Sequence, residues 1–362
     1  MPLSELQVQT ALKEIRDPNT GKDFISSKSA RNIRLDGNDI ALDIVLGYPA
    51  KSVAEDIRAL VHDKLARLPD AGNVSVNVSS KIVSHSVQRG VQLLPNVKNI
   101  IAVASGKGGV GKSTTAVNLA LALAAEGASV GLLDADIYGP SQPQMLGISD
   151  RPESTDGKSM EPLERYGIQA MSIGFLVDVD TPMVWRGPMV TGALEQLLRE
   201  TRWRDLDYLV IDLPPGTGDI QLTLSQKVPV TGAVIVTTPQ DIALLDARKG
   251  LKMFEKVGIP ILGIVENMST HICSNCGHQE HIFGAGGAAI MCQDYKVDLL
   301  GSLPLDIRIR EQTDGGKPTV VAEPDSEIAA AYKQIARVAA IKIAQLAMDH
   351  SSKFPNIVIQ NT

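Results

Sequence analysis

The residue types best suited to chemistry gather in a glycine-rich stretch, residues 105–114, with the sequence Ser-Gly-Lys-Gly-Gly-Val-Gly-Lys-Ser-Thr. It contains the pattern G-x-x-x-x-G-K-[ST], in which successive backbone N–H groups turn inward and cradle phosphate oxygens. Lys112 supplies a positive charge for the β- and γ-phosphates, and the Ser113 hydroxyl is a suitable Mg²⁺ ligand. The pattern therefore predicts that the phosphates of a nucleotide and Mg²⁺ bind at Gly106, Lys107, Gly108, Gly109, Val110, Gly111, Lys112, Ser113 and Thr114.

Four further polar residues lie at the ends of apolar runs that are typical of buried strands. Asp134 and Asp136 close one run, Asp212 ends a second, and Asn267 follows a third. Ligands of parallel sheets bind beyond the carboxyl ends of the strands, so these side chains are expected at one edge. Asp212 has the position of a Walker-B aspartate, whose carboxylate holds Mg²⁺ through its water shell.

Two cysteines, Cys273 and Cys276, form a C-x₂-C pair that allows three interpretations. A redox pair requires a thioredoxin-like context, which is absent from the sequence around it. A zinc knuckle would use His278 and His281 as further ligands, at a tight spacing. Half of an iron–sulfur site is the third interpretation, because a [4Fe–4S] cluster wants four thiolates and a two-fold dimer would supply the other two. The third cysteine, Cys292, lies in a helical stretch and is expected to be a buried structural thiol.

The elements that position these residues fall into two units. Residues 98–350 alternate strands with helices, which predicts a P-loop NTPase fold with a doubly wound, mostly parallel sheet. Residues 1–85 form a small α/β domain in the order α-β-β-α-β, residues 86–97 are a linker, and residues 351–362 are a tail. The strands of the larger unit are expected at 99–104, 128–136, 206–213, 232–238, 261–266 and 299–303.

Composition narrows the function classes. The chain has 362 residues, of which 44% are hydrophobic and 4% aromatic, as expected for buried parallel strands covered by helices. Its formal net charge of −6 argues against a nucleic-acid-coating role. No apolar run is long enough to span a bilayer, and the N-terminus has no secretory signal pattern. With only three cysteines, a reducing, cytoplasmic location is expected, with neither nucleic acid nor membrane as partner.

The heptapeptide at residues 107–113, Lys-Gly-Gly-Val-Gly-Lys-Ser, resembles the deviant P-loop of the MinD/ParA/nitrogenase-iron-protein group of ATPases. The resemblance implies that Lys107 reaches across a homodimer interface to the partner's nucleotide. It also implies that Asp136 orients or deprotonates the attacking water, that Asp134 supports the Mg²⁺ shell, and that Asn267 binds the adenine edge. Lys107, Lys112 and Asp136 are therefore the expected catalytic residues.

Further motifs are similar to those of the Mrp/ApbC (Nbp35-like) iron–sulfur cluster carriers. They are the D-x-P-P-G-T-G-D stretch at 212–219, Trp-Arg-Gly-Pro-Met at 185–189, and Glu-Asn-Met-Ser at 266–269 followed by the C-x₂-C pair. The resemblance implies a [4Fe–4S] cluster held by Cys273 and Cys276 across a dimer, slow ATP hydrolysis, and transfer of clusters to apoproteins in contact with the cluster assembly machinery.

The N-terminal domain resembles the MIP18-type domain found in some such proteins. Members of that domain family often carry a cysteine in the loop after the second strand, and the loop at 47–51 has none. An accessory docking role is therefore expected for this domain. Two other functions stay open at this point: a MinD/ParA-type positioning ATPase and a cluster-bearing electron-transfer ATPase.

Overall fold

The computed structural model describes residues 3–85, 87, 91–177, 187–273 and 275–353. The chain divides into two compact units. Of the described residues, the first unit contains 3–83 and 340–353, and the second contains the described part of 84–339. The last part of the C-terminal helix therefore belongs to the first unit, whereas the sequence analysis ends the nucleotide-binding domain at residue 350. Trp185, Arg186 and residues 354–362 lie outside the described residues.

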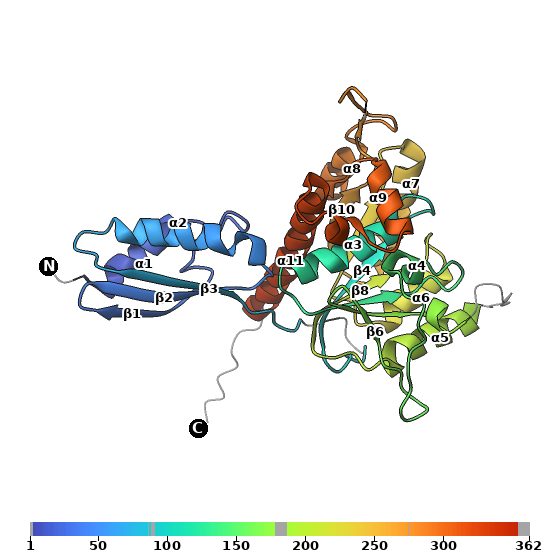
Figure 1. Cartoon of the computed structure of the whole chain (residues 1–362), viewed down its shortest axis with the longest axis horizontal. Helices are drawn as coiled ribbons and strands as arrows, with labels where there is room; N and C mark the ends of the chain where they lie inside the picture. Colours follow the sequence, from blue (N-terminus) through green and yellow to red (C-terminus); the bar gives the residue numbers. More distant parts are fainter. Residues whose placement is uncertain (1–2, 86, 88–90, 178–186, 274, 354–362) are drawn as a thin grey trace. The chain divides into compact units, whose positions relative to one another are not determined.

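The first unit has the predicted order α-β-β-α-β. Its elements are α1 (Glu5–Glu14), β1 (Ala30–Asp36), β2 (Asp39–Leu46), the short 3₁₀ helix η1 (Lys51–Val53), α2 (Ala54–Ala66) and β3 (Val74–Ser80). The sheet order is β1-β2-β3, with β1–β2 antiparallel and β2–β3 parallel. The two helices cover one face of this sheet (Figure 1).

Local sequence explains these elements. The Ser4 side chain accepts a hydrogen bond from the Gln7 N–H while the Gln7 side chain accepts one from the Ser4 N–H, which forms a capping box that starts α1. The alternation along β2 turns one row of side chains toward the helices. The core consists of Val8, Leu12, Ile40, Leu42, Ile44, Leu46, Ile57, Val61 and Leu65.

The second unit is built on an eight-stranded sheet of order β13-β10-β9-β4-β8-β5-β7-β6. All neighbouring pairs are parallel except β6–β7, so the predicted doubly wound, mostly parallel sheet is confirmed. The strands are β4 (Val97–Ala104), β5 (Val130–Asp134), β6 (Leu163–Arg165), β7 (Ile168–Ser172), β8 (Leu206–Asp212), β9 (Gly232–Thr237), β10 (Ile261–Glu266) and β13 (Leu299–Ser302).

Helices flank this sheet on both faces (Figure 1). They are α3 (Lys112–Ala125), α4 (Gln142–Leu146), α5 (Gly187–Glu200), α6 (Asp219–Lys227), α7 (Asp241–Lys256), α8 (Gly287–Tyr295), α9 (Ile307–Asp314), α10 (Thr319–Ala322) and α11 (Glu327–Lys353), with a 3₁₀ turn η2 (Ile173–Phe175). A small separate hairpin pairs β11 (His271–Ile272) with β12 (Gln279–Glu280). None of the described helices is both long and apolar enough to cross a lipid bilayer.

The sheet order determines where a ligand binds. The chain leaves β4 for β5 on one side, and later elements add β9, β10 and β13 on the other side of β4. This reversal makes the carboxyl end of β4 the topological switch point, where ligands of open α/β sheets bind. The glycine-rich loop follows β4 directly, so it lies at that point.

Candidate functional site

The glycine-rich loop joins β4 to α3 with a backbone that only glycine accommodates easily. Gly109 and Gly111 both have φ of 81°, in the left-handed region. A Cβ at Gly106 would overlap the α7 backbone at Asp246, so glycine is also needed there for close packing. The loop therefore delivers its backbone N–H groups and the N-terminus of α3 to one cavity of about 290 Å³.

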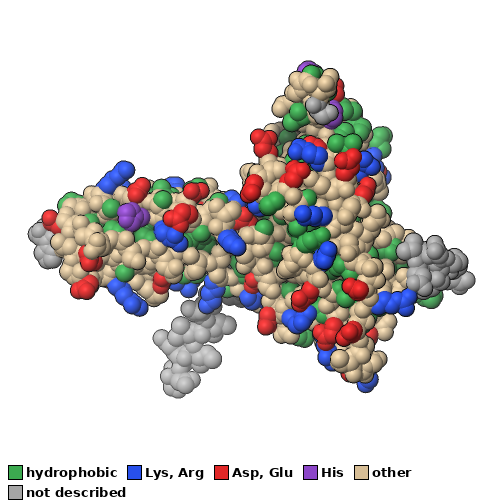
Figure 2. Space-filling view, in the orientation of Figure 1, with side chains coloured by type: hydrophobic (Ala, Val, Ile, Leu, Met, Phe, Trp, Pro, Cys, Tyr) green, Lys and Arg blue, Asp and Glu red, His purple; other side chains and the backbone are tan. Residues whose placement is uncertain are grey.

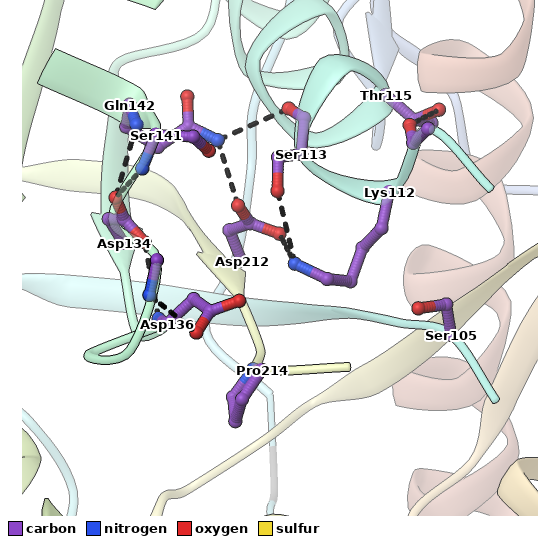
Figure 3. Close-up of polar contacts among 12 residues, drawn as sticks. Ser105, Lys112, Ser113, Thr115, Asp134, Asp136, Ser141, Gln142, Asp212 and Pro214 are labelled. Atoms are coloured by element: carbon purple, nitrogen blue, oxygen red, sulfur yellow. Dashed lines mark hydrogen bonds and ion pairs between the residues drawn. The ribbon is translucent and has the colours of Figure 1, made fainter. Parts of the chain in front are cut away.

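Lys112 and Ser113, the first two residues of α3, face the end of β8. The Lys112 ammonium forms an ion pair with the Asp212 carboxylate, and it also donates to the Ser113 Oγ at 3.2 Å (Figure 3). Both charged groups are almost fully buried, with 6% and 0% of their side chains exposed. The structure thus brings the predicted phosphate-binding lysine, the magnesium-binding hydroxyl and the Walker-B carboxylate together.

Gln142, at the start of α4, is a residue of this cluster that the sequence analysis missed. Its side-chain N–H₂ group donates to the Asp212 Oδ2 at 2.9 Å and to the Ser113 carbonyl at 3.1 Å (Figure 3). The side chain is buried. Gln142 therefore connects the segment after β5 with both the phosphate loop and β8. Its partners are 29 and 70 residues away in sequence, so only its position soon after two predicted site aspartates could have drawn attention to it.

Asp134 is fully buried at the end of β5 and organises the segment that follows. Its carboxylate accepts hydrogen bonds from three backbone N–H groups and from one hydroxyl: those of Asp136 (3.1 Å), Ser141 (3.0 Å), Gln142 (3.1 Å) and Ser172 (3.1 Å). Burial, and secondly the nearby charge of Asp212, raise the pKa of Asp134 to about 7. This carboxylate holds the turn that carries Asp136 and Gln142.

Asp136 lines the same cavity as the phosphate loop. Its carboxylate accepts a hydrogen bond from the Gly139 N–H at 3.3 Å and is half-buried. Burial raises the pKa of Asp136 above its usual range, which makes the carboxylate a stronger base. A carboxylate in this position can orient or deprotonate a water molecule close to phosphates held by Lys112.

Lys107 lies within the phosphate loop, and Asn267 contacts the loop from the end of β10. Lys107 also lines the cavity, and it forms no ion pair within the described part of the chain. The Ser105 hydroxyl donates to the Lys107 carbonyl at 2.9 Å, which fixes the backbone there. The buried Asn267 donates from its amide Nδ2 to the Val110 carbonyl at 2.9 Å. Asn267 therefore braces the phosphate loop, and one N–H of its amide is used for that contact.

The cysteine pair lies on the β11–β12 hairpin, which follows β10. The Cys273 N–H donates to the His278 carbonyl, and the Gly277 N–H donates to the Cys273 carbonyl, each at 2.9 Å. The Cys276 side chain is exposed and Cys273 is partly exposed. Backbone N–H groups, first that of Cys276 and then that of Asn275, lower the pKa of the Cys273 thiol. The hairpin therefore presents two accessible sulfur atoms, one of which is stabilised as a thiolate.

Two histidines of this segment, His271 and His281, contact backbone carbonyls. The His281 Nδ1 lies 2.7 Å from the Ser269 carbonyl, and the His271 Nδ1 lies 3.1 Å from the Leu305 carbonyl. In the described ranges, no three His, Cys, Asp or Glu side chains converge as a metal site would require. Figure 2 shows histidine side chains at the tip of the projection formed by this segment. One chain thus offers two accessible cysteine sulfur atoms on this hairpin, which is half of the four that a [4Fe–4S] cluster wants.

Cys292 differs from this pair. It is buried in α8, and burial raises the pKa of its thiol to about 11. Such a thiol is inert at neutral pH, as expected for a structural residue.

The parallel sheet, the phosphate loop after its central strand and the Lys112–Asp212–Ser113 cluster define a P-loop nucleoside triphosphatase. Comparison with known families gives the particular family. A family model described as NUBPL iron-transfer P-loop NTPase matches residues 96–340, and one described as iron–sulfur cluster assembly protein matches residues 5–78. The chain belongs to the family of NUBPL-type iron-transfer P-loop NTPases.

Individual relatives agree with this assignment and confirm the resemblance found in the sequence. The iron–sulfur cluster carrier protein of Haemophilus influenzae is 54% identical over 331 residues, which cover 91% of this chain and 90% of that protein. The solved structure of a nucleotide-binding protein from Archaeoglobus fulgidus in complex with ADP is similar, with 39% identity, a TM-score of 0.56, and coverage of 64% of this chain and 90% of that one. The cell division ATPase MinD of Pyrococcus furiosus has 25% identity and a TM-score of 0.50, with coverage of 69% and 99%.

Proposed function

We propose that the chain is an iron–sulfur cluster carrier that holds a [4Fe–4S] cluster as cargo between two copies and hydrolyses ATP slowly. The observation that carries the proposal is the exposed pair Cys273 and Cys276 on the β11–β12 hairpin. A cluster that is passed on must be reachable by an acceptor, and an exposed hairpin is reachable. A [4Fe–4S] cluster is held by four thiolates, and one chain offers two cysteines on this hairpin. A second copy of the chain, related by a two-fold axis, would supply the other two.

The nucleotide part of the proposal rests on the second cluster of residues. Mg²⁺ suits the oxygen donors at the carboxyl ends of β4 and β8, namely the Ser113 hydroxyl and the Asp212 carboxylate. The loop N–H groups and Lys112 bind the phosphates, Asp134 supports the segment around the metal, and Asp136 acts on the attacking water. By the resemblance to the deviant P-loop group, Lys107 reaches the partner's nucleotide and Asn267 contacts adenine. The ADP bound by the archaeal relative supports an adenine nucleotide.

The expected partners are a second copy of the chain, apoproteins that accept the cluster, and the assembly machinery that supplies it. The names of the H. influenzae relative and of the N-terminal family model support such partners. The thiolate ligands must stay reduced, so the proposal places the protein in a reducing compartment such as the cytoplasm. In this proposal each part of the chain has its own role. Residues 98–350 bind the nucleotide and the cluster, residues 86–97 are the linker between the domains, and residues 1–85 are an accessory domain that docks partner proteins.

The test is anaerobic reconstitution of the full chain with iron and sulfide. Iron and sulfide are counted per dimer, the native mass is recorded, and transfer to an apo-acceptor protein of the [4Fe–4S] type is followed. We expect about four irons and four sulfides per dimer. Cys276→Ser should lose cluster and transfer but keep ATP hydrolysis, while the matched control Cys292→Ser should change neither. One zinc per chain and no sulfide would overturn the proposal, and a cluster that stays bound in the presence of acceptor would favour electron transfer.

A further inference from the structure

The first unit contains a cavity of about 410 Å³ that the proposed nucleotide and cluster sites do not involve. It lies where the segment 17–29, the end of β2, the residues after β3 and the last part of α11 meet. Its apolar lining includes Val45, Leu46, Val83, Ile341 and Ala344. A volume of this size accommodates a small ligand or a few side chains of a bound peptide.

Four cationic side chains surround this apolar lining: Lys22, Lys28, Arg31 and Lys81. All four are exposed, and none forms an ion pair with a carboxylate within the described ranges. One acid, Asp17, also lines the cavity, but it is buried and accepts hydrogen bonds from the Tyr48 hydroxyl at 2.7 Å and the Asn19 N–H at 2.9 Å. Four cations against one internally bonded carboxylate form a local positive surface, in a chain whose formal net charge is −6.

Two of these cations, Lys28 and Arg31, lie at irregular positions of the backbone. Lys28 has φ of 58°, in the left-handed region, which costs a residue with a side chain roughly 1 kcal/mol. The pairing of β1 with β2 shifts register between Arg31 and Arg34, with Asn32 at φ of 50°. Bulges of this kind re-aim side chains, and strained backbone persists where the surrounding structure holds it. Both irregularities lie in the segment that places Lys28 and Arg31 at the cavity.

We propose that this cavity binds an extended, acidic segment of a partner protein, whose apolar side chains enter the cavity while its carboxylates contact the cations around it. The four cations come from three separate places in the chain: the segment 17–29, β1, and the residue after β3. Several carboxylates along one peptide would complement cations that come from several parts of the chain, and apolar side chains between them would complement the apolar lining. The lining of this cavity would thus be a protein-docking surface in the first unit, whereas the cysteine hairpin belongs to the second unit.

The experiment uses the full chain and three fluorescein-labelled ten-residue peptides. One alternates Leu with Asp, a second has Lys in place of Asp, and a third has Ser in place of Leu. Fluorescence anisotropy is recorded at low and at moderate salt. We expect the Leu/Asp peptide to bind, with affinity that falls as salt rises, and the other two to bind more weakly by about tenfold or more.

Variants locate the site. The double variant Lys28→Glu and Arg31→Glu should weaken binding of the Leu/Asp peptide by about tenfold or more. Lys51→Glu is the matched control, because Lys51 is an exposed lysine of the same unit outside the cavity lining. It should weaken binding by about twofold or less, because the charge lies outside the cavity lining and is screened by salt. Circular dichroism melting checks that each variant folds.

Several results would overturn the proposal. They are no binding of the Leu/Asp peptide, equal weakening by Lys51→Glu, or equal binding of the Ser-containing peptide. Binding of octanoate at the cavity without binding of the peptide would also overturn it, because the cavity would then be a site for a small amphipathic anion. The proposal rests on the docking role proposed for residues 1–85. Its outcomes are read without cluster content or ATP hydrolysis, so it can fail while the cluster-carrier function stands.

Discussion

Lys112 and Asp212 form a buried ion pair between the start of α3 and the end of β8. Lys112 begins the helix after β4, Asp212 ends β8, and Val103 of β4 pairs with Asp212 in the sheet. A phosphate that binds Lys112 competes with Asp212 for the same ammonium group. We therefore expect phosphate binding at Lys112 to release the Asp212 carboxylate, which would then be available to the water shell of Mg²⁺.

The first prediction separates the two lysines of the phosphate loop. Lys112→Ala should weaken ATP binding and lower hydrolysis by roughly 10²–10³-fold, because the phosphates lose their charge partner inside the cavity. Lys107→Ala should lower hydrolysis but keep most of the ATP affinity, if Lys107 acts on the nucleotide of the other copy. Equilibrium ATP binding and steady-state hydrolysis measure both effects. Equal loss of affinity in the two variants would contradict the action across a dimer.

The second prediction concerns the proposed base. Asp136→Asn should keep ATP and Mg²⁺ bound but slow the chemical step by roughly 10²-fold or more, the usual scale for a positioned general base. A single-turnover assay isolates this step from product release. Asp156→Asn changes an exposed acid outside the cavity and serves as control. Near-normal turnover of Asp136→Asn would mean that Asp136 has only a structural role.

The third prediction is a pH dependence of stability that comes from Asp134. Its pKa is raised from 3.8 to about 7 in the folded chain, so the folded state favours the protonated form. The stabilisation from this proton is fully present below the unfolded pKa and is lost as the pH rises toward and through about 7. Urea unfolding of wild type and Asp134→Asn from pH 4 to pH 8 should show the wild type losing stability relative to the variant. A difference that does not change with pH would be inconsistent with the raised pKa.

The fourth prediction tests Gln142 as a positioning residue. Gln142→Met keeps the length of the side chain but removes its N–H groups, so the buried Asp212 Oδ2 and the Ser113 carbonyl each lose the hydrogen bond that Gln142 donates. The free energy of unfolding should fall by about 1–3 kcal/mol, and hydrolysis should require more Mg²⁺. Gln142→Glu adds a negative charge next to Asp212 and should be worse than Met. If the Mg²⁺ dependence stays unchanged in both variants, Gln142 contributes to stability alone.

The fifth prediction concerns thiol reactivity. The lowered pKa of Cys273 favours its thiolate, whereas Cys292 is buried with a pKa of about 11. Iodoacetamide at neutral pH should therefore modify Cys273 well before Cys292, as read by mass spectrometry of peptides. Denaturation in urea should remove the difference, since both the hydrogen bonds and the burial are lost. Faster modification of Cys292 in the folded chain would contradict the assigned environments.

Local sequence patterns predicted the phosphate loop and the strands that carry Asp134, Asp212 and Asn267. Such patterns are local because a strand, its loop and its helix are adjacent in sequence. The hairpin of β6 and β7 escaped prediction, since its turn uses Tyr166 at φ of 51° followed by Gly167 in place of the usual Asn-Gly. Two side-chain contacts of the candidate site also could not be predicted from the sequence.

Both contacts join residues that are far apart in sequence. Gln142 reaches Asp212 across 70 residues, and Asn267 reaches Val110 across 157. Side-chain amides at such separations leave no periodicity or spacing signal, because their partners are chosen by the packing of neighbouring strand ends. The family resemblance pointed to Asn267 as an adenine contact, and the bracing of the phosphate loop became visible only in the folded chain.

The way in which the hairpin with Cys273 and Cys276 is joined to the rest of the second unit makes it a separable segment. It is inserted between β10 and α8, and the Ser269 N–H, which donates to the Leu303 carbonyl at 3.0 Å, anchors its start to the segment after β13. At its other end, where α8 begins, a Cβ at Gly287 would overlap the Leu244 side chain and the Pro239 carbonyl, so the chain packs closely there. Because β11 and β12 pair with each other and with no strand of the eight-stranded sheet, replacing the hairpin would leave every strand pairing of that sheet in place. We therefore expect that the segment can be exchanged or grafted as one unit while the nucleotide-binding sheet is kept.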